Sequence, residues 1–418
     1  MIKAVLINMS LGRIKQCSSL LLLVALSVIC STAQAQDDND YLRNTIIKSQ
    51  NQFSQSKQQY NNQAEPELSG LDAWVDDTEL RWKVSDFDQF EDQQVSYKVS
   101  LKNGEQVDAE RDILQLGEAK TGIKQSMILQ NRLKNSYLTI IDMIDQELRQ
   151  SLLQQQRQFA NDDLNHWKSQ VLSDNFRADK LLKADLSLDT LWAEEVDNRA
   201  SLNRYQQSLA GSVVTTRNLV SIQQMLDITQ HVLRTKSYEK HSPLVQKALL
   251  DNGIAERQQH RSYAQQNLAL KSVKILYDNK DDAFGAEVGV NIPLTRNSFE
   301  TAQKRQSAYY ASLDVDNTRA DIAEQLSQKQ FVLFRLQDQW LSNQGLLNRL
   351  ATRIKRVSQT GDLQLVLTLK NKQVSYQKNQ NQILVRALKQ YISFLHNAGL
   401  LAATPYRNWL KVGTPRIL

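Results

Sequence analysis

The sequence predicts a mainly α-helical fold with a small β part, built from two tandem repeats of a strand pair and a long helical hairpin. Two short alternating segments at 79–102 lead directly into a long helical stretch, and the same order returns at 271–294. Proline is scarce, and none falls between Pro66 and Pro243 or between Pro293 and Pro405. Both spans therefore allow long uninterrupted helices. Few globular folds need this order, whereas a membrane β-barrel joined to a helical tube does.

These patterns divide the chain into four parts. The predicted parts are a signal peptide at 1–35, a first repeat at 36–212, a second repeat at 213–400 and a C-terminal tail at 401–418. The first repeat holds an N-terminal helix, the strand pair 79–102 and the hairpin 106–211, and the second holds helices at 219–268, the strand pair 271–294 and the hairpin 297–397.

The first 35 residues have the three regions of a secretory signal. Lys3, Arg13 and Lys15 form a basic start, Leu20–Ile29 is an apolar run, and 33–35 is a small-x-small cleavage site. The apolar run is too short to span a membrane as a helix, although an uncleaved anchor is the alternative. We therefore expect the mature chain to be exported.

Both cysteines, Cys17 and Cys30, lie inside this predicted signal. The mature chain would then carry no disulfide and no thiolate metal site. Lipidation of Cys30 stays open, although the bulky Ile29 stands where a lipidation site usually has a small residue. An exported protein without disulfides needs another source of stability, such as a large core or an oligomer.

The charge balance does not point to nucleic acid. The full chain has a net charge of +6, but without the three basic residues of the signal 48 basic residues face 45 acidic ones, a balance of +3. The charges are interspersed rather than clustered, so no nucleic-acid partner is expected. After residue 35 no stretch approaches 18 apolar residues, so a membrane crossing would have to be made by strands.

Residues 298–358 carry the seven-residue apolar repeat of a coiled coil. One heptad position holds Leu326, Leu333, Trp340, Leu347 and Ile354, and the other holds Ile322, Leu336, Leu350 and Val357, with Lys329 and Asn343 as polar interruptions. At about 1.5 Å per residue, sixty residues reach roughly 90 Å, so this helix must project from any compact domain. Off the seam, Phe331, Phe334 and Leu341 widen the apolar stripe and predict neighbours on more than one side.

Each long helix is predicted to end at a turn, after which a second helix runs back alongside it. In the second repeat the turn lies at 360–362 and the return helix runs from about 364 to 397, ended by Gly399. In the first repeat the outgoing helix runs from about 106 to 172, with its turn at 173–175. We expect the two hairpins to lie side by side and to form part of a wall.

The four strand segments alternate between apolar and polar residues, which buries one face of a sheet and exposes the other to water. In a membrane barrel the apolar face meets lipid and the polar face meets the lumen. The predicted lipid-facing residues are Trp82, Tyr97, Val99, Val288 and Val290, and the predicted lumen residues are Arg81, Lys83, Lys98 and Lys274. Two alternatives stay open: an ordinary amphipathic sheet that covers a helix layer, and lumen cations that are ordinary polar-face residues.

Four strands are too few to close a barrel, because small barrels need about eight. A spanning barrel would therefore combine several copies of the chain, and three copies would supply twelve strands. Each strand segment is also near the short limit for crossing a bilayer.

The order of elements and several short motifs resemble the TolC family of outer-membrane efflux and secretion channels. The segment 288–294 resembles the last strand of that family and its Pro-Leu exit, and Ala302, Ala308 and Ala311 resemble its small-residue helix start. Gly361 stands where the family has a glycine at its periplasmic tip. The resemblance covers most of 40–400, and its weight lies in the order and spacing of motifs that are individually loose.

The resemblance implies a homotrimer with a β-barrel of twelve strands in the outer membrane and a tunnel of twelve hairpin helices in the periplasm. It implies a passive exit duct for a tripartite efflux or type I secretion system, whose tips contact a periplasmic adaptor protein fed by an inner-membrane pump. The matching tip residues are Asn175, Phe176, Arg177, Gly361, Asp362 and Leu363, and the matching tunnel entrance holds Leu367 and Lys370. The segment 365–370 has none of the acidic residues that narrow the entrance in some members, and Lys370 would make it basic.

No constellation for catalysis is present, so we expect neither an enzyme nor a cofactor. The five histidines are scattered, and the sequence has no G-x-S-x-G motif and no phosphate-binding glycine loop. The alternative function is a periplasmic coiled-coil scaffold without a pore. Such a scaffold would wash off membranes in salt or urea, whereas a channel would stay in the outer membrane and conduct ions.

Overall fold

The computed structural model describes residues 38–62, 73–84, 93–172, 176–208, 219–265, 267, 269–279, 282–292, 298–359 and 361–411. The predicted signal peptide and Cys30 lie outside these residues. The elements are α2 (Asp38–Asn62), β1 (Val75–Val84), β2 (Gln93–Leu101), α3 (Gly104–Ser169), α4 (Ala178–Ser208), α5 (Ile222–Arg234), α6 (Ser237–His241), α7 (Pro243–Ala264), β3 (Ala269–Asp278), β4 (Ala283–Asn291), α8 (Ser298–Ser358), α9 (Leu363–Asn397) and α10 (Leu400–Ala403). The prediction of a mainly helical fold with a small β part is therefore confirmed.

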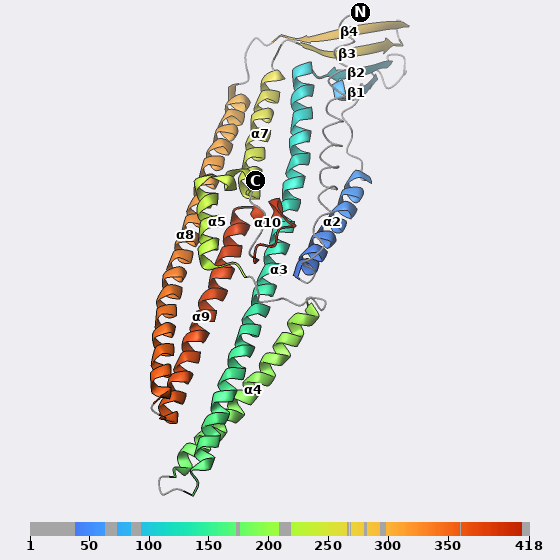
Figure 1. Ribbon diagram of the computed structural model, residues 1–418. Helices are drawn as coiled ribbons and strands as arrows, with labels where there is room; N and C mark the ends of the chain where they lie inside the picture. Colours follow the sequence, from blue (N-terminus) through green and yellow to red (C-terminus); the bar gives the residue numbers. More distant parts are fainter. Residues whose placement is uncertain are drawn as a thin grey trace, which may run out of the picture.

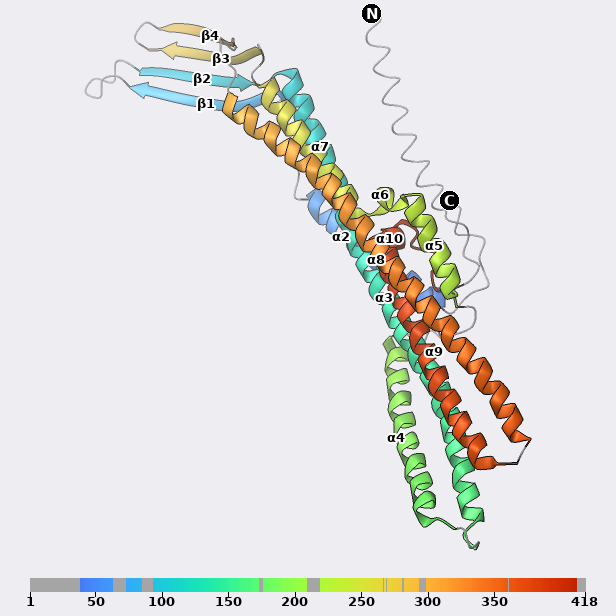
Figure 2. The ribbon, with the colours of Figure 1, turned by 90° about the vertical axis from the view of Figure 1, so that its left-hand side faces the viewer.

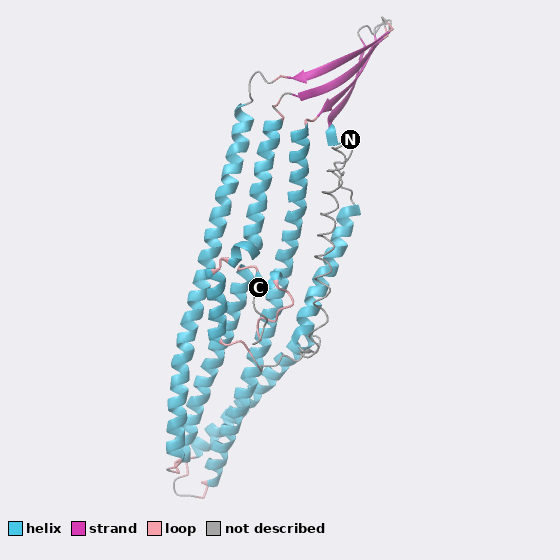
Figure 3. Cartoon of the chain, turned by 45° about the horizontal axis from the view of Figure 1, so that its top comes forward, coloured by secondary structure: helices cyan, strands magenta, loops and turns pink. Residues whose placement is uncertain are grey.

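The molecule is elongated, with long helices side by side and all strands at one end (Figures 1 and 3). α3 has 66 residues and α8 has 61, so they extend roughly 100 Å and 90 Å at about 1.5 Å per residue. α3 begins where the Asn103 side chain accepts a hydrogen bond of 2.8 Å from the Gln106 N–H, an N-cap that satisfies a free backbone donor. With no proline in either span, nothing interrupts these helices.

The two strand pairs join into one antiparallel sheet in the order β1-β2-β3-β4. The middle pairing links strands far apart in sequence: Tyr97 on β2 lies opposite Leu80 on β1 and Ile275 on β3. The sheet projects beyond the ends of α3, α7 and α8 (Figure 2). Along the chain, α2 precedes β1, α3 follows β2, α7 precedes β3 and α8 follows β4. The four helices lie across the molecule in the order α2, α3, α7 and α8, which is the order of their strands in the sheet (Figure 1).

The helices α3, α4, α7, α8 and α9 form a layer that we call the wall. α4 packs on α3, and both α7 and α9 pack between α3 and α8. α7 fills that place in the half nearer the sheet and α9 fills it in the half near the tips (Figure 1). The two halves meet where Gly399, just after α9, approaches the carbonyl of His241 at the end of α6.

One face of the wall is covered at mid-height by what we call the belt: α5, α6, α10 and residues 404–411 (Figure 2). The belt encloses the largest buried side chains, among them Tyr137, Met225, Tyr391 and Trp409. The Trp409 N–H donates to the Tyr137 hydroxyl at 3.3 Å, and that hydroxyl donates to the Arg407 carbonyl at 2.8 Å. The segment that the sequence indicated as a tail is therefore part of the core as far as residue 411.

Candidate functional site

One face of the sheet is apolar and exposed. The register aligns Leu80, Tyr97 and Ile275 on this face, and Phe284 is 80% and Trp82 67% exposed there. The same face carries all five residues predicted to meet lipid, Trp82, Tyr97, Val99, Val288 and Val290. Contiguous apolar patches of this kind are rare on soluble monomers and mark surfaces that another phase or molecule covers. The sheet does not cover a helix layer (Figure 2), as the open alternative would require.

The other face of the sheet is polar and carries both signs of charge. It holds the four predicted lumen cations, Arg81, Lys83, Lys98 and Lys274. Two of them have carboxylate partners on the same face: Arg81 pairs with Glu79, and the Lys274 ammonium lies 3.2 Å from Glu287. The sequence interpretation did not weigh these carboxylates, and they reduce the positive charge expected of this face.

The two outer strands of the sheet leave their outer edges unpaired in the described chain. Soluble proteins protect such edges with lysine, proline or a covering element. β4, with the sequence AFGAEVGVN, has neither lysine nor proline. The edges of β1 and β4 are therefore free to pair with neighbouring strands, and a ring that pairs them leaves no edge exposed.

The hairpin of α8 and α9 has the predicted heptad seam. Leu326 and Leu333 are fully buried in it. Asn343, one of the two predicted polar interruptions, donates to the Gln380 side chain at 2.7 Å and to the Tyr376 carbonyl at 2.8 Å. A buried asparagine with satisfied hydrogen bonds fixes the register of a coiled coil. The seam thus holds the tip at a defined distance from the sheet.

Both hairpins also carry apolar stripes that point away from their own seams. On α8, Phe331 is 65% exposed, and Phe334 and Leu341 are also exposed. On α4, Leu182 and Trp192 are about 60% exposed, and they lie on one side of the helix at its 3.6-residue period. α4 and α8 are the two margins of the wall, so these stripes lie where a neighbouring wall would pack.

The tip between α8 and α9 is built by its turn residues. Gly361 has φ +79°, a left-handed conformation that favours glycine. The Asp362 carboxylate then accepts a hydrogen bond of 3.0 Å from the Leu365 N–H and caps α9. Leu363 and Leu365 are exposed beside this cap. The tip therefore presents apolar side chains on a rigid turn.

The tip between α3 and α4 is described only in part, and Asn175 lies outside the described residues. Phe176 is half-buried, and Arg177 makes a two-pronged ion pair with Asp179 at 3.0 Å. Leu172, which the sequence interpretation missed, is 99% exposed. Leu172 directly precedes the turn predicted at 173–175, and this position is the feature of the sequence that could have identified it as a tip residue.

The two residues expected at a tunnel entrance have different environments. Leu367 is only 4% exposed, so it does not line an entrance, and that prediction is wrong. It lies on the apolar stripe of α9, which is the side of the helix that packs away from water. Lys370 is half-buried, and its ammonium lies 5.0 Å from the centre of the Phe159 ring on α3. This cation–π contact joins the two hairpins.

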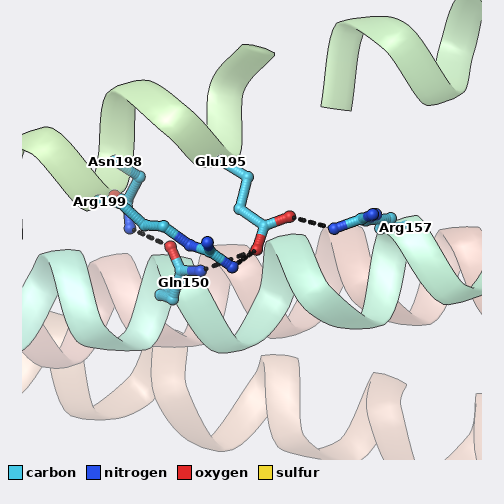
Figure 4. A network of polar contacts seen from close by, with 5 residues as sticks. All are labelled: Gln150, Arg157, Glu195, Asn198 and Arg199. Carbon is cyan, nitrogen blue, oxygen red and sulfur yellow. Dashed lines mark hydrogen bonds and ion pairs between the residues drawn. The ribbon is translucent and has the colours of Figure 1, made fainter. Parts of the chain in front are cut away.

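A polar cluster joins α3 to α4 (Figure 4). The Glu195 side chain is only 5% exposed and accepts hydrogen bonds from Arg157 at 3.0 Å, Arg199 at 2.6 Å and Gln150 at 3.3 Å. Asn198 donates to Gln150 at 2.8 Å and completes the cluster. Burial alone would raise the pKa of Glu195, but Arg157 and Arg199 lower it below its ordinary value. The carboxylate therefore stays charged and holds the hairpin together.

Replacing Glu195 with glutamine is expected to loosen α4 by about 1 kcal/mol at neutral pH, because the arginines are half-exposed and solvent weakens the pairing. The folded-state pKa is lowered, so the stabilisation exists above the ordinary value of 4.5 and is lost as the pH falls through the folded-state value. Hydrogen exchange of α4 should therefore be faster in Glu195→Gln at pH 7 and should approach the wild-type rate, corrected for intrinsic exchange, in strong acid. Glu194→Gln, whose carboxylate is half-exposed and 3.5 Å from Arg149, is the matched control with little expected effect.

Within the described residues, no helix is both long and apolar enough to cross a membrane. Across the same residues, no three His, Cys, Asp or Glu side chains gather as a metal site would require.

No protein-family profile and no curated protein sequence matches this chain. Solved structures do match. The outer membrane protein VceC of Vibrio cholerae superposes with a TM-score of 0.59 at 11% identity, over 87% of this chain and 97% of VceC. The CmeC outer membrane channel of Campylobacter jejuni gives 0.50 at 10% identity, over 90% of this chain and 84% of CmeC.

The chain has the fold of these two outer membrane proteins. The resemblance to the TolC family predicted from the sequence is thereby confirmed at the level of fold. Within this fold, the surfaces that stand out are the exposed sheet face, the margins of the wall and the tips. These are the surfaces that a single copy leaves uncovered.

Proposed function

We propose that the protein is the outer-membrane channel of a tripartite efflux or type I secretion system and forms a passive exit duct from the periplasm to the outside. The exposed apolar face of the sheet is the observation that carries this proposal. Side chains such as Phe284 and Val288 are exposed on a sheet that none of the described helices covers. Contact with lipid carries no hydrophobic penalty for such an apolar face, whereas its exposure to water costs free energy.

A homotrimer is the assembly that we propose. Each copy supplies four strands with both edges open, and pairing β4 of one copy with the β1 edge of the next continues the antiparallel order. Repeating that contact closes a ring, as head-to-tail interfaces do when their rotation closes. Three copies give twelve strands, enough for a barrel with an open lumen.

The same ring would align the three walls into a helical tunnel in the periplasm. The exposed stripes on α4 and α8 lie at the two margins of each wall, so packing one against the other buries both. Cargo would then move through water without any bond being broken. Pore width and lining charge would set which cargo passes.

The tips are the proposed docking surface for a periplasmic adaptor protein, which an inner-membrane pump would feed. Leu172 and Leu363 are exposed at the far end from the sheet. Apolar side chains on rigid, exposed turns are typical of partner surfaces. The tips of the three copies would together form a ring around the tunnel mouth.

Conductance of the purified protein in a planar lipid bilayer tests the proposed pore. We expect stable ion-conducting events, together with a heat-modifiable trimer that stays in outer membranes after urea washing. A trimer that never conducts, or a protein that urea releases, would instead favour the periplasmic scaffold.

Replacing Leu363 with aspartate is expected to reduce export at least about tenfold while outer-membrane levels stay normal. The side chain is exposed beside the Asp362 cap, so the fold should tolerate the change. A lost apolar anchor typically costs 1.4 kcal/mol or more of binding, which is a factor of ten. Cargo accumulation in cells carrying the cognate pump measures the effect.

Gln364→Asp is the matched control, because Gln364 is exposed on the same turn but is polar. Both variants add one negative charge near the tip, so only the loss of apolar surface separates them. Equal export by Leu363→Asp and the wild type would remove Leu363 from the docking surface.

A further inference from the structure

Two lysines and a histidine gather on one side of the wall at mid-height, and an arginine lies further along the same side of α9. Lys134 comes from α3, Lys329 from α8, and Arg386 and His396 from α9. The Lys329 ammonium donates to the Ser393 hydroxyl at 2.8 Å, which brings α8 and α9 together. One ring nitrogen of His396 lies 2.8 Å from the Asn131 side-chain oxygen, which joins α9 to α3. We call this set the cationic band.

The band lies on the side of the wall opposite the belt. Along α9, Tyr391 is fully buried against belt residue Trp409. Ser393 follows two residues later, which turns it about 200° around the helix axis. Arg386 precedes Ser393 by seven residues and therefore shares its side of the helix, where it is exposed.

The belt must lie outside a tunnel made of three walls. Twelve helices about 10 Å apart form a ring roughly 38 Å across between opposite axes, with about 28 Å of clear width. A belt one helix thick on the inner side of every wall would take about 20 Å of that width and leave a passage of only about 8 Å. The belt therefore belongs outside, and the band faces the tunnel. This step rests on the proposed function.

The cations of the band lack carboxylate partners. Among the described residues no acidic side chain lies within ion-pair distance of Lys134, Lys329 or Arg386, and the nearby Asp142 is occupied by Lys389 at 2.7 Å. Burial, and then the neighbouring lysine Lys134, lower the pKa of Lys329. Burial is the main cause that lowers the pKa of His396. The hydrogen bond to Asn397 opposes this shift, whereas Lys134 and Lys329 add to it, so the pKa lies below its ordinary value and His396 is neutral at pH 7. Within the described residues, Lys134, Lys329 and Arg386 therefore have no ion-pair partner, whereas Lys389 faces both Asp142 and Asp145.

We infer that the cationic band makes the tunnel favour anionic cargo, such as small molecules that carry carboxylate, phosphate or sulfonate groups. Three copies would place six positive charges, from Lys134 and Lys329, around one level of the duct, and three more, from Arg386, about 10 Å nearer the tips. Half-buried charges of one sign in a narrow passage concentrate counter-ions there. The band is local: further along the same side of α8, Asp314 and Asp321 line a small hollow with Lys247.

The Cl⁻/K⁺ permeability ratio in planar bilayers, measured from reversal potentials across a KCl gradient below about 0.1 M, tests this inference, since salt screens charges over about 10 Å at that concentration. The wild type should prefer Cl⁻. In Lys134→Gln/Lys329→Gln the ratio should fall at least about twofold, because a unit charge about 10 Å from an ion in water changes its population by roughly that factor. Arg386→Gln, at an exposed position, should shift the ratio in the same direction and gives a second variant if the double one assembles poorly.

Lys236→Gln/Lys240→Gln is the matched control. It removes the same charge from the belt, outside the proposed tunnel, and should leave the permeability ratio unchanged. Three results overturn the inference: a wild type without Cl⁻ preference, band variants with an unchanged ratio, or a belt variant that shifts the ratio equally. In each of these the pore itself conducts, so the proposed function survives. A wild type that never conducts overturns both.

Discussion

Replacing Val288 with arginine is expected to lower the amount of trimer in the outer membrane at least tenfold. Val288 lies near the middle of β4 on the apolar face, is 60% exposed and stands opposite Val273. An arginine on the lipid face of a barrel near the bilayer midplane costs about 2–4 kcal/mol, and a trimer would carry three. Fractionation of outer membranes, followed by the yield of heat-modifiable trimer, measures the loss.

Glu287→Arg is the matched control, because it places the same side chain one residue earlier on the opposite face of β4. That arginine would face Lys274, the present partner of Glu287, but in a water-filled lumen the repulsion is screened. We expect nearly normal trimer. If Val288→Arg also inserted normally, the apolar face would not meet lipid, and the channel proposal would lose the observation that carries it.

Local periodicity predicted the features that depend only on neighbouring residues. Alternation in the strands placed Trp82 and Arg81 on opposite faces of the sheet, because a strand has a period of two wherever it pairs. The heptads of 298–358 predicted the buried Leu326 and Leu333, because a coiled-coil seam repeats along a single helix. The glycine turn at Gly361 followed from the same kind of local rule.

Contacts between distant segments could not be predicted in this way. Trp409 is 272 positions from Tyr137, whose hydroxyl it contacts, and nothing near Trp409 in the sequence indicates that partner. Nothing near Glu195 in the sequence indicates its burial, because its partners Gln150 and Arg157 lie across the hairpin on α3. Leu367 was assigned to an entrance by its place after the turn, whereas its place on the stripe of α9 decided its burial.

Replacing Gly399 with alanine is expected to destabilise the core by about 3–5 kcal/mol, which is large for a single methyl group. Gly399 has φ +81°, where a side chain costs about 1 kcal/mol. A Cβ there would lie 1.9 Å from the His241 carbonyl oxygen and 2.7 Å from the Ser242 nitrogen. These are backbone atoms at the junction of α6 and α7, so relief requires moving a helix end rather than a side chain.

The measurement is the denaturant midpoint of the detergent-solubilised protein, followed by the fluorescence of its tryptophans, which include the buried Trp409. Gly361→Ala is the control that separates the two costs, because Gly361 has nearly the same φ of +79° but no atom within 4 Å of the added Cβ. It should lose only about 1 kcal/mol. The difference between the variants then reports the contact between the end of α9 and the start of α7, the point where the two halves of the wall are joined. Equal losses in both would mean that this contact contributes nothing to the stability of the fold.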